Sequence, residues 1–337
     1  MNPLVSVVIP TYNRGWCIER TLESVFAQTH KNIEVIVVDD ASTDDTAERL
    51  APFLDKITYI RHSTNQGIAL QAEGGPARNT GIGRATGDYL AFLDGDDLWE
   101  PDKLAVQVQA AARFPQAGLI VADGFPFSHE DGTILRSSLL HDYGDDFCGS
   151  LPEGAVVEAD LYHRLLRGCV IDTPSQVMVP SKVLQTVGNF AQHRADDYDF
   201  YIRLAAQFKV VLIKKHLVKY RVHTGNVSGP VAMQFFQFTQ PNLLIRKKHL
   251  KVCRPEVRPL VKQQIKEGLV TAAEKARDEG LRGQRRWASR FLWRLLMKNP
   301  FEPGSLYVAL SLVGLWTPGW VLATFRPVTR RMLRHLE

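Results

Sequence analysis

Three acidic clusters contain the side chains whose types and spacing could do chemistry. They lie at 39–40, 94–97 and 196–199; the first two follow short apolar runs and the third opens a stretch with helical spacing. Gly95 permits a tight turn in the second cluster, where like charges repel unless a cation or hydrogen bonds compensate. Hard oxygen ligands suit Mg²⁺ or Mn²⁺, which also bind substrate phosphate oxygens. A carboxylate of the third cluster could serve as a general base.

Each cluster also has a structural explanation when it is considered alone. Asp or Ser after the first run can cap the next helix, and carboxylates at a helix start are stabilised by the helix dipole. A D-x-D turn is often simply solvated. His223, just past an apolar run, is as a lone histidine more often structural than a ligand. No single motif therefore establishes a site.

The elements that must position these clusters alternate between strands and helices. Strands are predicted from apolar, β-branched runs at 4–9, 34–38, 57–60, 89–93, 119–122 and 176–179. Helical spacing is found at 18–26, after 44, and at 76–85, 101–112 and 198–207. The alternation predicts an α/β domain with a mostly parallel sheet, whose ligands bind at the carboxyl ends of the strands. Residues 123–160 are rich in Gly, Pro, Asp and Ser, and we interpret them as an excursion or flap.

Composition places the chain among ordinary globular enzymes. The 337 residues are 45% hydrophobic and 23% charged, which excludes a disordered or collagen-like chain. Four scattered cysteines without a C-x-x-C pair argue against a zinc finger or a disulfide framework. The first residues show no secretory signal, so we expect a cytoplasmic protein. G-x-G at 81–83 lacks the third glycine of a dinucleotide site, and no P-loop, G-x-S-x-G or H-E-x-x-H motif is present.

Charge divides the chain in two. Residues 242–337 contain 20 Lys and Arg against 7 Asp and Glu, whereas residues 1–241 contain 21 against 29. The pattern is helical from about 231 onward. We therefore expect a catalytic domain at 1–230 and a helical, basic C-terminal region at 231–337, which has a separate task or a docking surface.

The ordered set of motifs resembles the family 2 inverting glycosyltransferases of the GT-A fold. The matching segments are 5–14, 38–46, 77–81, 92–97, 188–190, 196–199 and 220–223. The resemblance covers roughly residues 4–228. It implies a GT-A-type, Rossmann-like sheet flanked by helices, with a nucleotide-sugar half and an acceptor half. It also implies a hexosyltransferase type of reaction with a nucleotide-diphosphate sugar donor, usually UDP-linked, and Mg²⁺ or Mn²⁺.

The resemblance assigns donor-site residues position by position. Thr11 and Asp40 would hold the nucleoside, with Asp40 on the base. Arg78 and Asn79 would lie beside the ribose or the diphosphate. Asp94 begins the D-x-D motif.

The remaining assignments concern the metal and the proton. Asp96 would be the direct metal ligand of the D-x-D motif, and His223 would reach the metal or the diphosphate. Asp197 would be the catalytic base. The chain departs from the family at Asp196, where the usual residue is glutamate.

The C-terminal region leaves its own alternatives open. Residues 285–296 interleave arginines with aromatic and aliphatic residues, as expected of a helix on a membrane surface or of a helix packed on the catalytic domain. Residues 305–325 lack charge over a length that could span a bilayer, but Pro318-Gly319 would break a straight helix. We expect peripheral or re-entrant contact with the cytoplasmic face of an anionic membrane, with a span or a soluble hairpin as alternatives.

The expected acceptor is a saccharide or a lipid-linked saccharide, in the synthesis of cell-surface polysaccharide or glycolipid. Two rival functions come from other classes. A nucleotidyltransferase would also use a metal and an α/β sheet, but its glycine-rich phosphate loop is missing. A degenerate transferase acting as an adaptor would be expected to lose the D-x-D motif or the base, and both are present. We do not expect nucleic acid as a partner, although the basic tail keeps an adaptor for it open.

Overall fold

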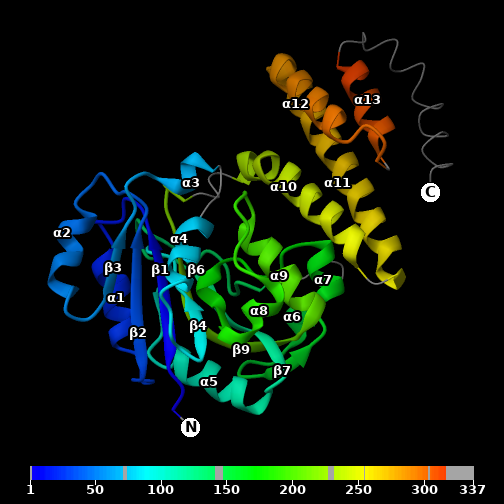
Figure 1. Ribbon diagram of the computed structural model, residues 1–337. Coiled ribbons are helices and arrows are strands. Elements are labelled where there is room, and N and C mark those ends of the chain that lie inside the picture. The colour runs from blue at the N-terminus through cyan, green and yellow to red at the C-terminus, as the bar shows by residue number, and fades with distance from the viewer. Residues whose placement is uncertain are drawn as a thin grey trace. The chain divides into compact units, whose positions relative to one another are not determined.

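The computed structural model describes residues 2–70, 74–140, 147–226, 231–253, 255–302 and 304–315. The chain divides into two compact units, Met1–Gly229 (unit 1) and Pro230–Glu337 (unit 2). Figure 1 shows the sheet and its helices in unit 1 and the helices of unit 2. Each unit is described below by itself.

Unit 1 is an α/β unit built around one sheet. Its strands are β1 Val5–Thr11, β2 Ile33–Asp39, β3 Thr58–Arg61, β4 Tyr89–Phe92, β5 Leu98–Trp99, β6 Ala117–Ser128, β7 Val156–Ala159, β8 Val177–Pro180 and β9 Lys209–Val222. Its helices are α1 Ile18–Phe26, α2 Thr46–Leu50, α3 Gln66–Ala69, α4 Gly75–Ile82, α5 Lys103–Arg113, α6 Phe147–Ser150, α7 Tyr162–Arg167, α8 Leu184–Val187 and α9 Asp196–Gln207. The predicted strands and helices therefore form, with bounds shifted by a few residues.

The sheet is parallel in one half and mixed in the other. Its order is β3-β2-β1-β4-β8-β6-β9-β5, and β7 pairs with β9. The first four strands in this order are parallel, whereas β8 is antiparallel to both β4 and β6. Strands β6 and β9 are again parallel. The carboxyl ends of β1, β2 and β4 therefore meet at one edge, where the first two acidic clusters lie.

The predicted flap at 123–160 is partly regular structure. Strand β6 continues through it to Ser128, and β7 and α6 follow. Gly124 lies at a register irregularity between β6 and β9, where an added Cβ would be 2.0 Å from the Val218 carbonyl oxygen. The glycine and Pro126 made this segment read as a loop, but here the glycine permits a bulge with close backbone approach.

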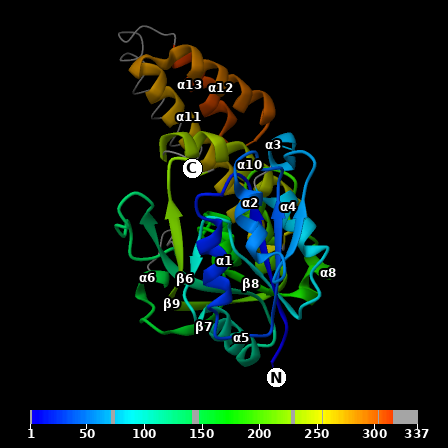
Figure 2. The same ribbon diagram turned by 90° about the vertical axis from the view of Figure 1, so that its left-hand side faces the viewer.

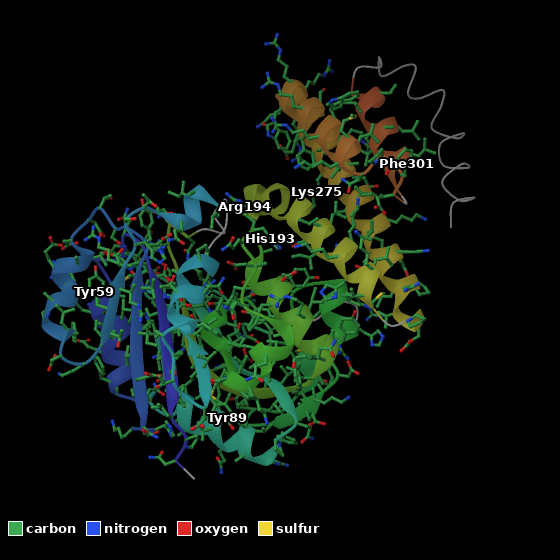
Figure 3. The ribbon with its side chains drawn as sticks, in the orientation of Figure 1. Tyr59, Tyr89, His193, Arg194, Lys275 and Phe301 are labelled. Atoms are coloured by element: carbon green, nitrogen blue, oxygen red, sulfur yellow. The ribbon has the colours of Figure 1, made fainter. Side chains whose placement is uncertain are left out.

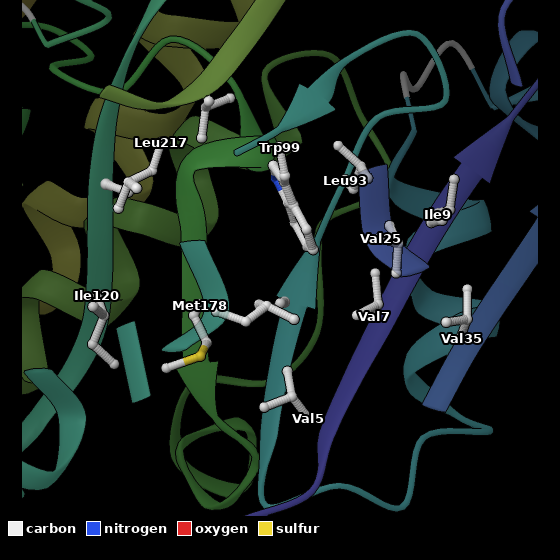
Figure 4. Packing of buried hydrophobic residues seen from close by; sticks show 14 of the residues in the cluster. Val5, Val7, Ile9, Val25, Val35, Leu93, Trp99, Ile120, Met178 and Leu217 are labelled. Atoms are coloured by element: carbon white, nitrogen blue, oxygen red, sulfur yellow. The ribbon is translucent and has the colours of Figure 1, made fainter. Parts of the chain in front are cut away.

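The core of unit 1 lies between the sheet and helices α1 and α5. Val5, Val7 and Ile9 of β1 are fully buried, and they pack in one cluster with Trp99 and Met178 (Figure 4). Burying a large aliphatic side chain is worth about 1.5–3 kcal/mol. Trp99 is therefore a core residue of unit 1.

Unit 2 is helical in its described part. It contains α10 Val231–Val252, α11 Arg258–Glu279, α12 Arg285–Lys298 and α13 Ser305–Gly314, with a π-helical turn at Gly280–Gln284. Helices α11, α12 and α13 lie side by side in both views (Figures 1 and 2). The buried residues of α11 face the neighbouring helices at helical spacing: Val261, Ile265, Leu269, Ala272, Ala273 and Ala276.

Candidate active site

The loops that contain the predicted residues include the strained backbone positions of unit 1. Among the described residues, three non-glycine residues have positive φ: Asn13 (53°), Ala41 (65°) and Ala195 (58°). They follow β1, follow β2 and precede α9, respectively. Such residues commonly cluster at functional sites, because the strain persists only where surrounding structure enforces it. Each of the three lies beside one of the segments that contain the predicted site residues.

Asp96 and His223 come together from the ends of β4 and β9. His223 Nε2 lies 3.0 Å from Asp96 Oδ2, and Arg14 Nε donates to the same oxygen at 2.8 Å. Burial alone would raise the pKa of Asp96, but the hydrogen bonds and charges of His223 and Arg14 hold it below its ordinary value. The predicted metal ligands are thus neighbours, and Arg14 supplies the compensating positive charge.

The donor set fits a divalent cation that takes further ligands from its substrate. A carboxylate oxygen and an imidazole nitrogen suit Mn²⁺ or a similar cation. Within the described ranges, no group of three or more His, Cys, Asp and Glu side chains is arranged to hold a metal. Phosphate oxygens and water would therefore have to complete the coordination, as is usual for Mg²⁺ at phosphate sites.

Asp97 fixes the D-x-D turn through hydrogen bonds to the segment before β8 and to β9. It is fully buried, and its carboxylate accepts hydrogen bonds from Ser175 Oγ (2.6 Å), Thr173 Oγ1 (3.2 Å) and the Arg221 backbone N–H (2.9 Å). Burial and the charges of Asp96 and Asp94 raise its pKa well above the usual range. Arg221 also donates from Nε to the Asp96 carbonyl oxygen at 2.7 Å. Asp97 thus couples the turn to β9, just before His223.

Arg78 lies between the second and third acidic clusters. Its Nη2 donates to Asp94 Oδ1 at 2.6 Å, and its Nη1 is 3.6 Å from Asp196 Oδ1. The approach requires Gly75, where an added Cβ would be 2.1 Å from Asp196 Oδ2. The first turn of α4 therefore packs directly on the start of α9, and one buried guanidinium joins the two clusters.

Asp196 and Asp197 have different environments. Asp196 is fully buried, and neither carboxylate oxygen has a hydrogen-bond partner among the described residues. Burial and the charge of Asp197, opposed by Arg78, raise the pKa of Asp196 to about 7. Asp197 is partly exposed, and burial raises its pKa as well. Asp197 is therefore the member of the pair that is more open to a ligand.

Asp40 is engaged by the start of α3. Its carboxylate accepts hydrogen bonds from the Gln66 N–H (2.9 Å) and the Gly67 N–H (2.8 Å), and His62 Nδ1 lies 2.6 Å away. The other ring nitrogen of His62 is 2.9 Å from Thr80 Oγ1. Two of these partners lie at Asp40 Oδ1 and one at Oδ2, so Oδ2 keeps the capacity to accept a further hydrogen bond.

Thr11 and Asp39, at the ends of β1 and β2, differ in whether their side-chain oxygens already have hydrogen-bond partners. Thr11 Oγ1 is buried at the end of β1 and has no hydrogen-bond partner in the described part of the chain. Asp39 accepts hydrogen bonds from the Ser42 N–H (2.7 Å) and the Tyr59 hydroxyl (2.9 Å). Asp39 thus stabilises the loop after β2, whereas the Thr11 hydroxyl still has hydrogen-bonding capacity to offer.

Asn79 pairs with the backbone of Phe190. Its Nδ2 donates to the Phe190 carbonyl oxygen at 2.9 Å, and its Oδ1 accepts from the Phe190 N–H at 3.0 Å. The Phe190 ring stacks on Phe200 of α9, with 4.3 Å between ring centroids. Asn79 therefore holds the segment that leads to the acidic pair.

Sequence reasoning assigned no role to Arg14, His62, Trp16 or Arg221. The ring centroid of Trp16 is 4.9 Å from that of His223 and 4.5 Å from that of His129. Arg14 and Arg221 lie inside the matching segments 5–14 and 220–223. Their positive charge within these segments could have indicated that they neutralise the acidic turn. His62 and Trp16 had no local signal.

Comparison with known proteins gives the family. Residues 6–147 match the family model described as glycosyl transferase family 2. The amylovoran biosynthesis glycosyltransferase AmsB of Erwinia amylovora is 32% identical over 223 residues, which cover 65% of this chain and 70% of AmsB. The chain belongs to glycosyl transferase family 2. The predicted family is thus confirmed, and the coarser prediction of a glycosyltransferase is supported.

Solved structures resemble the transferase in fold. Residues 1–349 of S. aureus TarS, in complex with UDP-GlcNAc, have a TM-score of 0.61 at 18% identity, with 93% of this chain and 89% of that chain covered. The mannosyltransferase PcManGT from Pyrobaculum calidifontis, in complex with GDP-Man and Mn²⁺, has a TM-score of 0.55 at 19% identity, with 93% and 87% covered. The predicted GT-A fold of the transferase is confirmed.

Proposed function

We propose that the transferase moves a sugar from a nucleoside-diphosphate donor to an acceptor hydroxyl in one metal-dependent, inverting displacement. The observation that carries this proposal is the position of Arg78, which contacts both the D-x-D turn and the start of α9. The metal-side carboxylate and the base would then act in one site. UDP is the expected nucleotide, and TarS with bound UDP-GlcNAc supports this choice.

The nucleoside would be held at the ends of β1 and β2. Thr11 offers a buried hydroxyl without a partner among the described residues, and Asp40 offers a carboxylate at the end of β2. Because Asp40 Oδ2 accepts one hydrogen bond, from the Gly67 N–H, a base N–H would donate to the same oxygen beside the bonds to α3. Arg78 would lie beside the ribose or the diphosphate as well as between the acidic clusters. Asn79 would act by holding the segment around Phe190.

Asp96 and His223 would hold Mg²⁺ or Mn²⁺, and Asp94 would complete the D-x-D motif beside them. When bound, the cation supplies positive charge to the departing diphosphate. The structure of PcManGT with Mn²⁺ and GDP-Man supports the choice of cation. Arg14, now on Asp96, would have to share or release that carboxylate.

Asp197 would accept the proton of the acceptor. The acceptor oxygen forms a bond to the anomeric carbon while the bond from that carbon to the diphosphate oxygen breaks, so the leaving group departs with the electron pair. The hydroxyl proton passes to the Asp197 carboxylate. A pKa raised by burial makes this carboxylate a better base than an exposed aspartate. A single displacement inverts the anomeric configuration and needs no enzyme nucleophile.

The acceptor would be a saccharide or a lipid-linked saccharide. AmsB acts in amylovoran biosynthesis by its name, which supports a role in cell-surface polysaccharide or glycolipid synthesis. The acceptor hydroxyl would have to reach Asp197 at the start of α9.

The proposal is tested with the purified full chain and a panel of nucleotide sugars in Mn²⁺. Slow release of nucleoside diphosphate identifies the donor without the acceptor, and we expect a chelator to abolish it. Asp96→Asn should weaken Mn²⁺ binding, measured by electron paramagnetic resonance. It should also lower the rate of nucleoside-diphosphate release by about 10²-fold or more. Asp55→Asn, a control at an exposed carboxylate of unit 1, should change neither. Full release in chelator would make the D-x-D motif structural.

A further inference from the structure

Unit 2 exposes large apolar side chains on α12, on α13 and in the turn between them. Trp293 is 55% exposed, Met297 59% and Phe301 98%, and Leu306 of α13 is 54% exposed. Figure 3 labels Phe301 in that turn. Single exposed apolar residues are common, but several on adjoining elements usually mark an interaction site.

On α12 these side chains share one face with arginines. Positions 286, 290, 293 and 297 are spaced by four, three and four residues, which places Arg286, Arg290, Trp293 and Met297 in one row along the helix. All four side chains are exposed. The opposite side of α12 is buried and consists of Ala288, Leu292 and Leu295.

The two helices of this surface carry no negative charge, and Glu302 in the turn between them is paired with Lys247 at 2.8 Å. Helix α12 contains five basic residues and no acidic one, and α13 contains no charged residue. The two helices pack against each other. A partner of this face would therefore meet positive charge next to aromatic and aliphatic side chains.

We propose that this face docks on the surface of an anionic lipid bilayer. It is defined by Arg286, Arg290, Trp293 and Met297 of α12, the turn at Phe301, and Leu306 of α13. The arginines would lie at the lipid phosphates, while the tryptophan and its apolar neighbours enter the boundary between headgroups and acyl chains. Stacking on nucleobases would use Trp293 but leave the aliphatic side chains in water, so a lipid surface fits the composition better than a nucleic acid.

The contact would be peripheral as far as the described helices are concerned. None of them combines the length and the low polarity required to cross a bilayer. The second part of the uncharged stretch at 305–325, from 316 onward, lies outside the described residues, as does the Arg cluster that follows it.

The first arm of the test is flotation of the full chain with vesicles of phosphatidylcholine alone or with phosphatidylglycerol added. We expect flotation with the anionic vesicles and about tenfold weaker partitioning for Trp293→Ser/Met297→Ser. The control Leu54→Ser/Val252→Ser, at two other exposed apolar positions, should leave partitioning unchanged. Recovery of the wild type in the soluble fraction with both vesicles would overturn the proposal.

The second arm tests charge. Arg286→Gln/Arg290→Gln should lower partitioning onto the anionic vesicles about tenfold, and added salt should mimic it. The control Arg84→Gln/Lys182→Gln removes the same charge from exposed positions of unit 1 and should have no effect. An equal loss of partitioning in the control would show that only the net charge of the chain matters, and would refute the proposal for this face.

Rival occupants have distinct signatures. If the face binds a second copy of this chain, Trp293→Ser/Met297→Ser lowers the sedimenting mass, and vesicles show no uptake of the wild type. If it binds nucleic acid, salt-sensitive binding to RNA or DNA replaces flotation. Both outcomes would overturn the proposal. Unchanged thermal unfolding and unchanged nucleoside-diphosphate release by the variants in solution would exclude misfolding.

Discussion

Arg78 does work that a lysine could not do equally well. One nitrogen of its planar guanidinium donates to Asp94 and another approaches Asp196. The guanidinium carbon Cζ lies over the Phe190 ring, 5.4 Å from the ring centroid. A lysine ammonium is a compact point charge without this fixed fork. At the residue scale, the buried guanidinium of Arg78 therefore holds the carboxylates of the site together.

Asp197→Asn should remove sugar transfer while donor binding stays within about twofold, because the amide keeps the shape but cannot accept the proton. We expect the transfer rate to fall by about 10²–10⁴-fold, the usual contribution of a positioned base. Rates with acceptor and donor affinity by calorimetry would measure the two effects. Asp199→Asn is not a suitable control because Asp199 pairs with Arg203, so exposed Asp55→Asn is used instead. Transfer at the wild-type rate would refute the assignment.

Asp196→Asn should change stability in a pH-dependent way. The raised pKa of about 7 means that the folded state keeps a proton that the unfolded chain releases near pH 4. The stability from this group is complete below pH 4 and is lost as the pH rises through 7. The variant avoids this loss, so its free energy of unfolding relative to the wild type should rise between pH 5 and pH 8 by up to about 3 kcal/mol. Denaturant unfolding at both pH values measures it, and a constant difference would contradict the cause given.

At the scale of elements, α5 begins with an uncompensated buried amine. Lys103 is fully buried, and its Nζ has no hydrogen-bond partner among the described residues. The nitrogen lies 3.6 Å from the centroid of the Trp99 ring, which replaces only part of its hydration. Burial holds the pKa of Lys103 well below its usual range. We therefore expect this lysine to lower the stability of the core around α5 and Trp99.

Lys103→Met should therefore stabilise unit 1. Methionine fills a similar volume without a proton to lose, so the free energy of unfolding at pH 7 should rise by about 1–3 kcal/mol. Because the unfolded wild type binds the extra proton only below pH 10.5, the gain should shrink as the pH approaches that value. Denaturant unfolding measures it, with exposed Lys182→Met as the control. A destabilised variant would mean that the contact with the Trp99 ring outweighs the cost of burial.

At the scale of the whole molecule, each unit buries its own apolar residues. The large core cluster draws entirely on unit 1, from Val5 to Val218. In unit 2, the buried row of α11 faces α10, α12 and α13. Domains with separate cores generally fold separately. The residues proposed for chemistry all lie in unit 1, and those proposed for lipid contact all lie in unit 2.

A chain that ends at residue 229 should therefore fold by itself. We expect one cooperative thermal transition, and nucleoside-diphosphate release within about threefold of the full chain, because core and site residues are all retained. The same chain should lose flotation with anionic vesicles. Calorimetry and the release assay measure the first two. Aggregation, or loss of release with the fold intact, would show that unit 1 depends on unit 2.

The sequence by itself determined the order of the main elements and the family. Runs such as 4–9 and 89–93 are apolar because strands inside a sheet are covered on both faces, and that requirement is local enough to be read from composition. The first two acidic clusters directly follow the runs at 34–38 and 89–93, so their convergence at one edge was also predictable.

Tertiary structure alone decided which polar side-chain atoms are already paired and which remain available to a ligand. Asn79 is paired with Phe190, 111 positions away, and Asp96 with His223, 127 positions away. No local pattern contains such partners, because they meet only after the sheet has formed. Asp196 and Asp197 are chemically identical neighbours in sequence. Packing against Gly75 and Arg78 buries the first and leaves the second partly exposed.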